Sequence, residues 1–201
     1  MAVNQALTRR QWLLGGLGLC AGGGGLAWYQ NHKRFNHFEV HDPGLVYRSA
    51  WLEADAFAEL IARYQIRSIV NLCNPDEMGH QRCLDERAAV EGSGAILHDA
   101  TMPNTIDPAD PQVARLVEIL ANPANYPLLV HCQHGVTRTA KFLAMYDILY
   151  RQLSAEESLA RMPVFGHGEY TISVHAFARN FEQQHAARYP QAAGALEQLR
   201  R

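Results

Sequence analysis

The chain has 201 residues, of which 48% are hydrophobic and 19% charged, and its formal net charge is -2. This length accommodates one domain with a hydrophobic core and is short for two. The balanced charge argues against a nucleic-acid-binding protein, and the apolar content argues against a disordered chain. The four cysteines are scattered and have no zinc-ligand spacing, so the sequence predicts no disulfide scaffold, no metal and no other cofactor.

Residues 1–30 read as a signal or a membrane anchor. Residues 12–29 form an uncharged, glycine-rich run that follows Arg9 and Arg10. The interior glycines would weaken a core helix, so burial of this run inside the domain is not expected. Residues 8–13 resemble a twin-arginine export signal, and the preceding positive charge favours a domain outside the cytoplasmic membrane. We therefore expect a bacterial periplasmic protein, either released or anchored to the inner membrane through residues 12–29, rather than a cytoplasmic one.

From about residue 42, short apolar strands alternate with helical patterns. The sequence predicts strands at 46–48, 68–72, 95–97 and 128–130. It predicts helices over 57–64 and 81–91, and further helices that begin near residues 111, 138 and 155. This alternation indicates an α/β fold of three layers, with a central, mostly parallel sheet flanked by helices. We expect one domain over 42–187 and a polar tail over 188–201.

The strongest chemical signal follows the strand at 128–130. The loop His131-Cys132-Gln133-His134-Gly135-Val136-Thr137-Arg138 leads from this strand into a helix. Such a turn directs successive backbone N–H groups toward an anion at the helix N-terminus, so residues 133–138 are expected to bind phosphate. Gly135 permits a backbone conformation that a Cβ would resist, and Arg138 can hold two phosphate oxygens. The same positive field lowers the thiol pKa, so Cys132 is the expected nucleophile of a phosphocysteine mechanism.

Thr139 follows the loop arginine directly. Its hydroxyl can donate a hydrogen bond to the sulfur of Cys132 and so help the thiolate to leave when the phosphocysteine is hydrolysed. It can also bind the backbone at the start of the helix. These two roles can coexist.

The pattern His131-Cys132-x-x-Gly135-x-x-Arg138-Thr139 resembles the signature of the protein tyrosine and dual-specificity phosphatase superfamily. Residues 116–162 resemble atypical dual-specificity phosphatases of plants and fungi and, equally, bacterial periplasmic tyrosine phosphatases. The resemblance covers about residues 44–165. It implies a phosphomonoester hydrolase that acts on phosphorylated proteins, with phosphotyrosine favoured.

Two alternatives accompany this interpretation. The plant and fungal group would usually carry Lys-His in place of Val136-Thr137. That Lys-His pair sits over inositol pyrophosphates. The departure here weakens the assignment of an inositol pyrophosphate. An inositol phosphate or another small phosphoester stays the alternative substrate, although it would favour more Lys or Arg in the loop than Arg138 alone. An inactive phosphopeptide-binding module, the alternative from another class, would normally have lost Cys132 or Arg138.

The resemblance also implies a general acid, an Asp on a mobile loop upstream of the cysteine. The candidates are Asp107, Asp110 and Asp99. Asp110 has the sequence context of a helix N-cap, and Asp99 ends a predicted strand. Asp107 lies between two prolines and four residues after Pro103, where similar bacterial phosphatases carry their acid. We favour Asp107 over Asp110, and Asp110 over Asp99.

Two supporting residues follow from the resemblance. In such loops, the residue at His131 is more often a buried imidazole that binds the backbone and shapes the surroundings of the cysteine than a catalytic base. Cys73 resembles a position from which some lipid-phosphate relatives form a disulfide with the catalytic cysteine, which makes it a candidate redox partner of Cys132. Its alternative role is that of a small buried hydrophobic residue.

Overall fold

The computed structural model describes residues 33–162 and 169–185. The chain divides into two units, Met1–Phe35 and Asn36–Arg201, and the sheet with its flanking helices belongs to the second. The predicted signal or anchor at 1–30 and the predicted tail at 188–201 lie outside the described residues. Within the described part of the chain, no helix is both long enough and apolar enough to cross a membrane.

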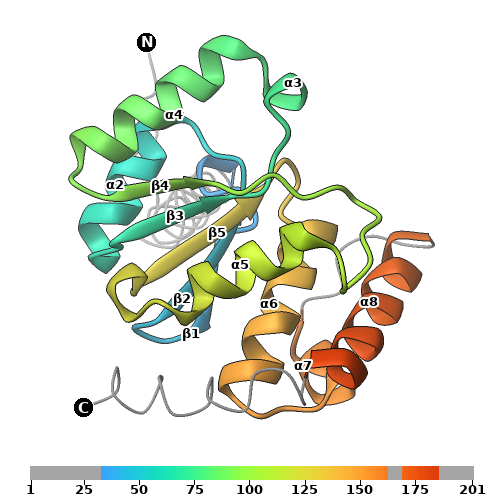
Figure 1. Ribbon diagram of the computed structural model, residues 1–201. Coiled ribbons are helices and arrows are strands. Elements are labelled where there is room, and N and C mark those ends of the chain that lie inside the picture. Colours follow the sequence, from blue (N-terminus) through green and yellow to red (C-terminus); the bar gives the residue numbers. More distant parts are fainter. Residues whose placement is uncertain (1–32, 163–168, 186–201) are drawn as a thin grey trace, which may run out of the picture. The chain divides into compact units, whose positions relative to one another are not determined.

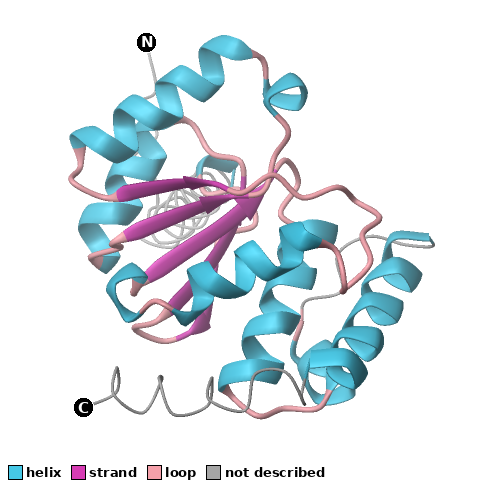
Figure 2. Ribbon diagram, in the orientation of Figure 1, coloured by secondary structure: helices cyan, strands magenta, loops and turns pink. Residues whose placement is uncertain are grey.

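A five-stranded sheet forms the middle layer of this unit, as Figures 1 and 2 show. Its order is β1 (Glu39–Asp42), β2 (Val46–Ala50), β5 (Leu128–Cys132), β3 (Ser68–Asn71) and β4 (Ile96–Asp99). β1 is an antiparallel edge strand, and the other four strands are parallel. The predicted α/β class with a mostly parallel sheet is confirmed. β1 is an addition, because the sequence reads as a polar stretch before about residue 42.

Helices cover both faces of the sheet (Figure 1). One group contains α2 (Ala54–Tyr64) and α4 (His80–Gly92), with the short α3 (Pro75–Met78) just before α4. The other group contains α5 (Pro111–Ala121), α6 (Thr137–Tyr150), α7 (Ala155–Arg161) and α8 (Glu169–His185). The three predicted layers are therefore present, and α8 is a helix that the sequence analysis did not propose.

Local sequence signals set the helix starts where they were expected. Asp110 caps α5, since its carboxylate accepts a hydrogen bond from the N–H of Gln112 at 2.8 Å. Ser154 and Glu157 form the predicted capping box of α7. Each cap satisfies backbone N–H groups that the first helical turn leaves without partners.

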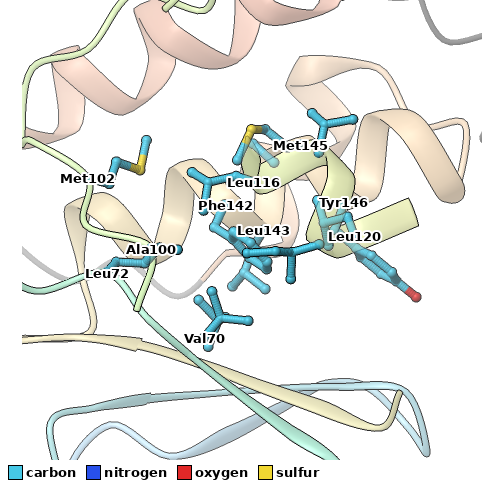
Figure 3. Close-up of a cluster of buried hydrophobic side chains, with 14 of the residues drawn as sticks. Val70, Leu72, Ala100, Met102, Leu116, Leu120, Phe142, Leu143, Met145 and Tyr146 are labelled. Carbon is cyan, nitrogen blue, oxygen red and sulfur yellow. The ribbon is translucent and has the colours of Figure 1, made fainter. Parts of the chain in front are cut away.

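The core lies largely around α6, which is buried on nearly all sides. Figure 3 shows side chains from four segments in contact there, namely Val70 and Leu72, Ala100 and Met102, Leu116 and Leu120, and Phe142, Leu143, Met145 and Tyr146. In the sequence, one apolar stripe along this helix consists of Phe142, Met145, Tyr146 and Leu149. In the structure the polar side chains Lys141 and Asp147 are buried as well.

The parallel register brings functional residues together at one edge of the sheet. Ala50 is the partner of Cys132 in the β2–β5 pairing, and Asn71 is the partner of His131 in the β3–β5 pairing. The carboxyl ends of β2, β3 and β5 therefore meet at the start of the loop 131–138. Open parallel sheets bind ligands just beyond this edge.

Candidate active site

The loop between β5 and α6 lines a pocket of about 540 Å³. The residues of this pocket are His37, Asn104, Cys132, Gln133, His134, Val136, Thr137 and Arg138. Five of the six residues predicted to bind phosphate are among them. The side chains of Gln133 and His134 are exposed at the pocket, whereas Gly135 is buried behind it.

The carbonyl groups of the loop are held from outside. Three consecutive carbonyl oxygens accept hydrogen bonds from other segments, so their peptide planes have fixed orientations. The pairs are Gln133 O with the N–H of Trp51 at 3.3 Å, His134 O with His37 Nδ1 at 2.7 Å, and Gly135 O with the guanidinium of Arg48. In a trans peptide the C=O and the following N–H point in opposite directions. The N–H groups after these carbonyls therefore point into the loop, where they can bind an anion.

Gly135 is required by close packing against β2. Its φ is +63°, in the left-handed region. A Cβ added there would lie 2.6 Å from the backbone N of Ala50 and 2.6 Å from the carbonyl oxygen of Ser49. Neither backbone atom can rotate away, so only glycine fits this position.

The Cys132 thiol lies in surroundings that favour its thiolate. The side chain is buried, and the hydroxyl of Thr139 donates a hydrogen bond to Sγ at 3.3 Å. Burial raises the pKa of Cys132, but hydrogen bonds from Thr139 and Val136 and the charge of Arg138 outweigh it, so the net pKa is lowered. The predicted contact between Thr139 and the sulfur is therefore present.

Arg138 is fixed by an acidic side chain that the sequence analysis missed. Its Nη1 donates to Glu77 Oε2 at 2.7 Å and to the carbonyl of Leu72 at 3.2 Å. Its Nε is buried and has no hydrogen-bond partner among the described residues. The guanidinium is thus held from one side, while Nε remains suited to a phosphate oxygen.

Glu77 could have been found from its helix signal. Asn74 and Glu77 form the capping box of α3, with Pro75 at the first helical position. Burial raises the pKa of Glu77, whereas hydrogen bonds from Arg138 and Asn74 lower it, and the net pKa is lowered. The carboxylate is therefore ionised beside the Arg138 guanidinium.

His131 is buried, as expected, but its partner is a carboxylate rather than the backbone. Its Nε2 donates to Glu86 Oε1 at 2.8 Å. Glu86 also accepts a hydrogen bond from Asn71 Nδ2 at 3.4 Å, and Asn71 Oδ1 accepts the N–H of Cys73 at 2.8 Å. This chain of polar contacts joins the carboxyl ends of β5 and β3, so His131 orders the surroundings of Cys132. Sequence patterns did not single out Glu86, which lies on a helix that reads as polar throughout.

None of the three candidate acids lines the pocket. The exposed Asp107 accepts a hydrogen bond from the N–H of Ala109 at 2.8 Å. Asp110 is occupied as an N-cap, and Asp99 pairs with Arg87. Asn104, on the same loop as Asp107, does line the pocket. The role of Asp107 stays a prediction, and it requires the loop to move.

Cys73 is buried near Cys132, and Cys73, Cys83 and Cys132 are all free thiols. Burial raises the pKa of the Cys73 thiol, and the negative charge of the Cys132 thiolate adds to this effect. Cys73 is therefore a neutral thiol when Cys132 is the nucleophile. Its role as a redox partner stays a prediction.

A parallel sheet that delivers a low-pKa cysteine into an anion-binding loop closed by an arginine defines the class of cysteine-dependent phosphatases. The chain belongs to the DSP-PTPase phosphatases, since the family model described as "DSP-PTPase phosphatase fused to NAD+ Kinase" matches residues 43–180.

Relatives and solved structures agree with this assignment. The dual specificity protein phosphatase TpbA of Pseudomonas aeruginosa is 30% identical over 124 residues, which are 62% of this chain and 52% of TpbA. The chain therefore matches about half the length of this relative. The fold is similar to the core catalytic domain of the S. cerevisiae PP-IP phosphatase SIW14, with a TM-score of 0.61, 21% identity and coverage of 80% and 94% of the two chains. It is also similar to the P. aeruginosa TpbA structure, with a TM-score of 0.55, 21% identity and coverage of 83% and 92%.

Proposed function

We propose that the chain is a protein tyrosine or dual-specificity phosphatase in which Cys132 forms a phosphocysteine intermediate. The observation that carries this proposal is the buried, low-pKa thiol of Cys132 inside a ring of inward-facing N–H groups, with Arg138 held beside it by Glu77. Fixed donors of this kind stabilise the charge that develops on a transferring phosphoryl group.

In the first step, the phosphate oxygens accept hydrogen bonds from the loop N–H groups and from Arg138. The thiolate of Cys132 attacks phosphorus, and the S–P bond forms as the bond to the ester oxygen breaks. The leaving oxygen takes a proton from Asp107 after the loop has closed over the pocket. General acids of this kind contribute typically ~10²–10⁴-fold to the rate.

In the second step, water attacks the phosphocysteine. The carboxylate of Asp107 accepts the proton of this water, and inorganic phosphate forms as the S–P bond breaks. The hydroxyl of Thr139 stabilises the departing thiolate through the hydrogen bond to Sγ. The enzyme returns to its starting protonation state.

Phosphorylated proteins are favoured over inositol pyrophosphates as substrates. Arg138 is the only Lys or Arg among the described residues that line the pocket, where two histidines contribute the other basic side chains. A densely charged inositol pyrophosphate would be better matched by several cations. Among the similar structures, one of TpbA is a complex with phosphotyrosine, which supports a phosphotyrosine substrate here.

A substrate panel tests this proposal. Wild type, Cys132→Ser and Asp107→Asn would be assayed with a phosphotyrosine peptide, a phosphoserine peptide, inositol phosphates and p-nitrophenyl phosphate. We expect Cys132-dependent turnover that is fastest on the phosphotyrosine peptide. Absence of such turnover on every substrate would refute the phosphatase assignment, and tight phosphopeptide binding without turnover would support an inactive binding module instead.

The general acid is tested by comparing two variants on a substrate with a poor leaving group. We expect Asp107→Asn to slow turnover of phenyl phosphate. We expect Asp110→Asn to leave the rate nearly unchanged and to lower the stability of the protein only slightly. The reverse result would transfer the role to Asp110.

We also propose that residues 1–30 deliver the domain to the periplasmic side of the bacterial inner membrane. The support is the Arg9-Arg10 pair followed by the uncharged run 12–29. Fractionation of cells that express the full chain tests this. We expect Arg9→Lys combined with Arg10→Lys to retain the protein in the cytoplasm, and unchanged export would contradict a twin-arginine route.

Cys73 is proposed as the thiol that protects Cys132 from irreversible oxidation. Attack of Cys73 on a Cys132 sulfenic acid would form the disulfide and release water. Peroxide treatment followed by non-reducing mass spectrometry should then detect a peptide that links the two cysteines. Its absence at peroxide levels that inactivate the enzyme would end this hypothesis.

A further inference from the structure

Lys141 is a buried cation that the proposed chemistry does not use. Its side chain is 1% exposed, although it lies only three residues after Arg138 on α6. It has no ion pair with any carboxylate in the described part of the chain. Asp147, another buried charge of α6, differs from Lys141, since it contacts His41, Arg151 and Ser158. A buried lysine without a counterion is uncommon, because its desolvation is unfavourable.

The ammonium of Lys141 joins three segments of the domain. It donates hydrogen bonds to the backbone carbonyl of Asn104 and, at 2.8 Å, to the hydroxyl of Ser173 on α8. It also lies 5.5 Å from the ring centroid of Phe177, one helical turn further along α8. The contact with Asn104 reaches the loop that carries Asp107 and supplies part of the pocket wall.

Keeping this charge buried has a free-energy cost that a neutral side chain would avoid. Burial lowers the pKa of Lys141 to about 8. Only two of the 18 basic residues of the chain are lysines. The ammonium carries three donors, so it can bind the loop carbonyl and the hydroxyl at the same time. On the active-site side, the group that this ammonium holds is the Asn104 carbonyl.

The loop between β4 and α5 is held near both of its ends, and the contact with Lys141 lies between them. Met102 is fully buried in the core shown in Figure 3, and its N–H donates to the carbonyl of Leu72 at 3.2 Å. At the far end, Asp110 is held as the N-cap of α5. Lys141 adds a third anchor at Asn104, two residues after Met102. The exposed Asp107 lies on the segment between Asn104 and Asp110.

We propose that Lys141 is a positioning residue for the acid loop, which it holds through the Asn104 carbonyl so that the following segment closes with Asp107 over the leaving group. This inference rests on the proposed function, because it assigns Lys141 a part in the protonation of the leaving oxygen. Without the anchor, the segment that has to order on closure would extend back to Met102. A longer mobile segment costs more conformational entropy to close and places the carboxyl group less accurately.

The test compares substrates that need the acid with one that does not. Lys141→Met keeps the volume and length of the side chain and removes the donor, so it should fold. We expect it to lower kcat on phenyl phosphate about tenfold or more, since misplacement by 1 Å can cost about 100-fold. The rate on 2,4-dinitrophenyl phosphate, whose phenolate leaves without a proton, should change much less. Lys141→Arg, which restores a donor, should recover part of the phenyl phosphate rate.

Hydrogen exchange gives a readout that does not depend on catalysis. In Lys141→Met, peptides covering residues 101–110 should exchange faster, while peptides covering 131–139 should exchange as in wild type. Ser173→Ala, which removes only the second acceptor, is the matched control and should leave the ratio of the two substrate rates within about twofold of wild type.

The outcomes separate this inference from the proposed function. Equal losses on both substrates, or no loss on either, together with unchanged exchange at 101–110, would overturn the role of Lys141 while leaving a Cys132-dependent phosphatase intact. If wild type hydrolyses neither substrate, the proposed function fails, and exchange at 101–110 then decides whether Lys141 anchors the loop.

Discussion

Replacement of Gly135 by alanine gives the sharpest test of how the loop is built. The new Cβ would lie 2.6 Å from two backbone atoms of β2, and ordinary contacts begin near 3.4 Å. The loop backbone must therefore move by about 0.8 Å away from β2. This movement displaces the inward N–H groups and weakens the hydrogen bond that Arg48 donates to Gly135 O. A misplacement of this size costs about 100-fold in rate, so kcat/KM on p-nitrophenyl phosphate should fall by about that factor.

Gly94 provides the matched control for this substitution. It has a similar φ of +76°, but a Cβ added there meets no atom within 4 Å. Gly94→Ala and Gly135→Ala should share a strain of about 1 kcal/mol from the left-handed backbone, seen as a lower Tm. Only Gly135→Ala should lose activity. If Gly135→Ala keeps kcat/KM within tenfold of wild type, or Gly94→Ala loses as much, the close packing against β2 does not shape the site as argued.

Three further predictions concern charge around the site. Glu77→Gln should lower kcat/KM about 10- to 100-fold, because the charge-assisted hydrogen bond that holds Arg138 is lost, and an unchanged value would show that the arginine is fixed by other contacts. Thr139→Val should raise the pKa of Cys132, since a hydrogen bond to the thiolate disappears, so the pH midpoint of inactivation by iodoacetate should move upward. The free energy of unfolding of wild type, measured by urea titration, should rise between pH 8 and 10.5. Lys141→Met should abolish this rise. The folded-state pKa of about 8 lies below the ordinary lysine pKa of 10.5, so the unfolded state binds more protons in this window and stability rises with pH. A parallel pH dependence in wild type and variant would contradict this assignment.

Local patterns predicted the elements that depend on nearby residues. The caps at Asp110 and Ser154 lie where their sequences place them, because each cap is a contact between residues two or three positions apart. The strand at 128–130 and the helix after Arg138 were also predicted, because the patterns that indicate them lie within short stretches of the sequence. β1 was missed, because two of its four residues are exposed and the segment forms a strand only by pairing with β2.

The partners of the loop could not be predicted in the same way. Arg48, Glu77 and Glu86 are separated from the residues they hold by 87, 61 and 45 positions. No periodic pattern connects such pairs, and sequence alone leaves their charges indistinguishable from surface charges. The burial of Lys141 could not be predicted either. Its position on the helix is polar in the sequence pattern, and it is buried only because α5, α7 and α8 pack around α6.

The sequence by itself determined the chemistry of this protein, because Cys132, Gly135, Arg138 and Thr139 lie within eight residues and a strand–loop–helix turn is enough to bring them together. The tertiary structure decided what holds that loop in shape, what fixes the arginine, and where the loop that carries Asp107 is anchored. These depend on contacts between segments far apart in the chain, and such contacts exist only once the sheet has set its strand order and the helices have packed on its two faces.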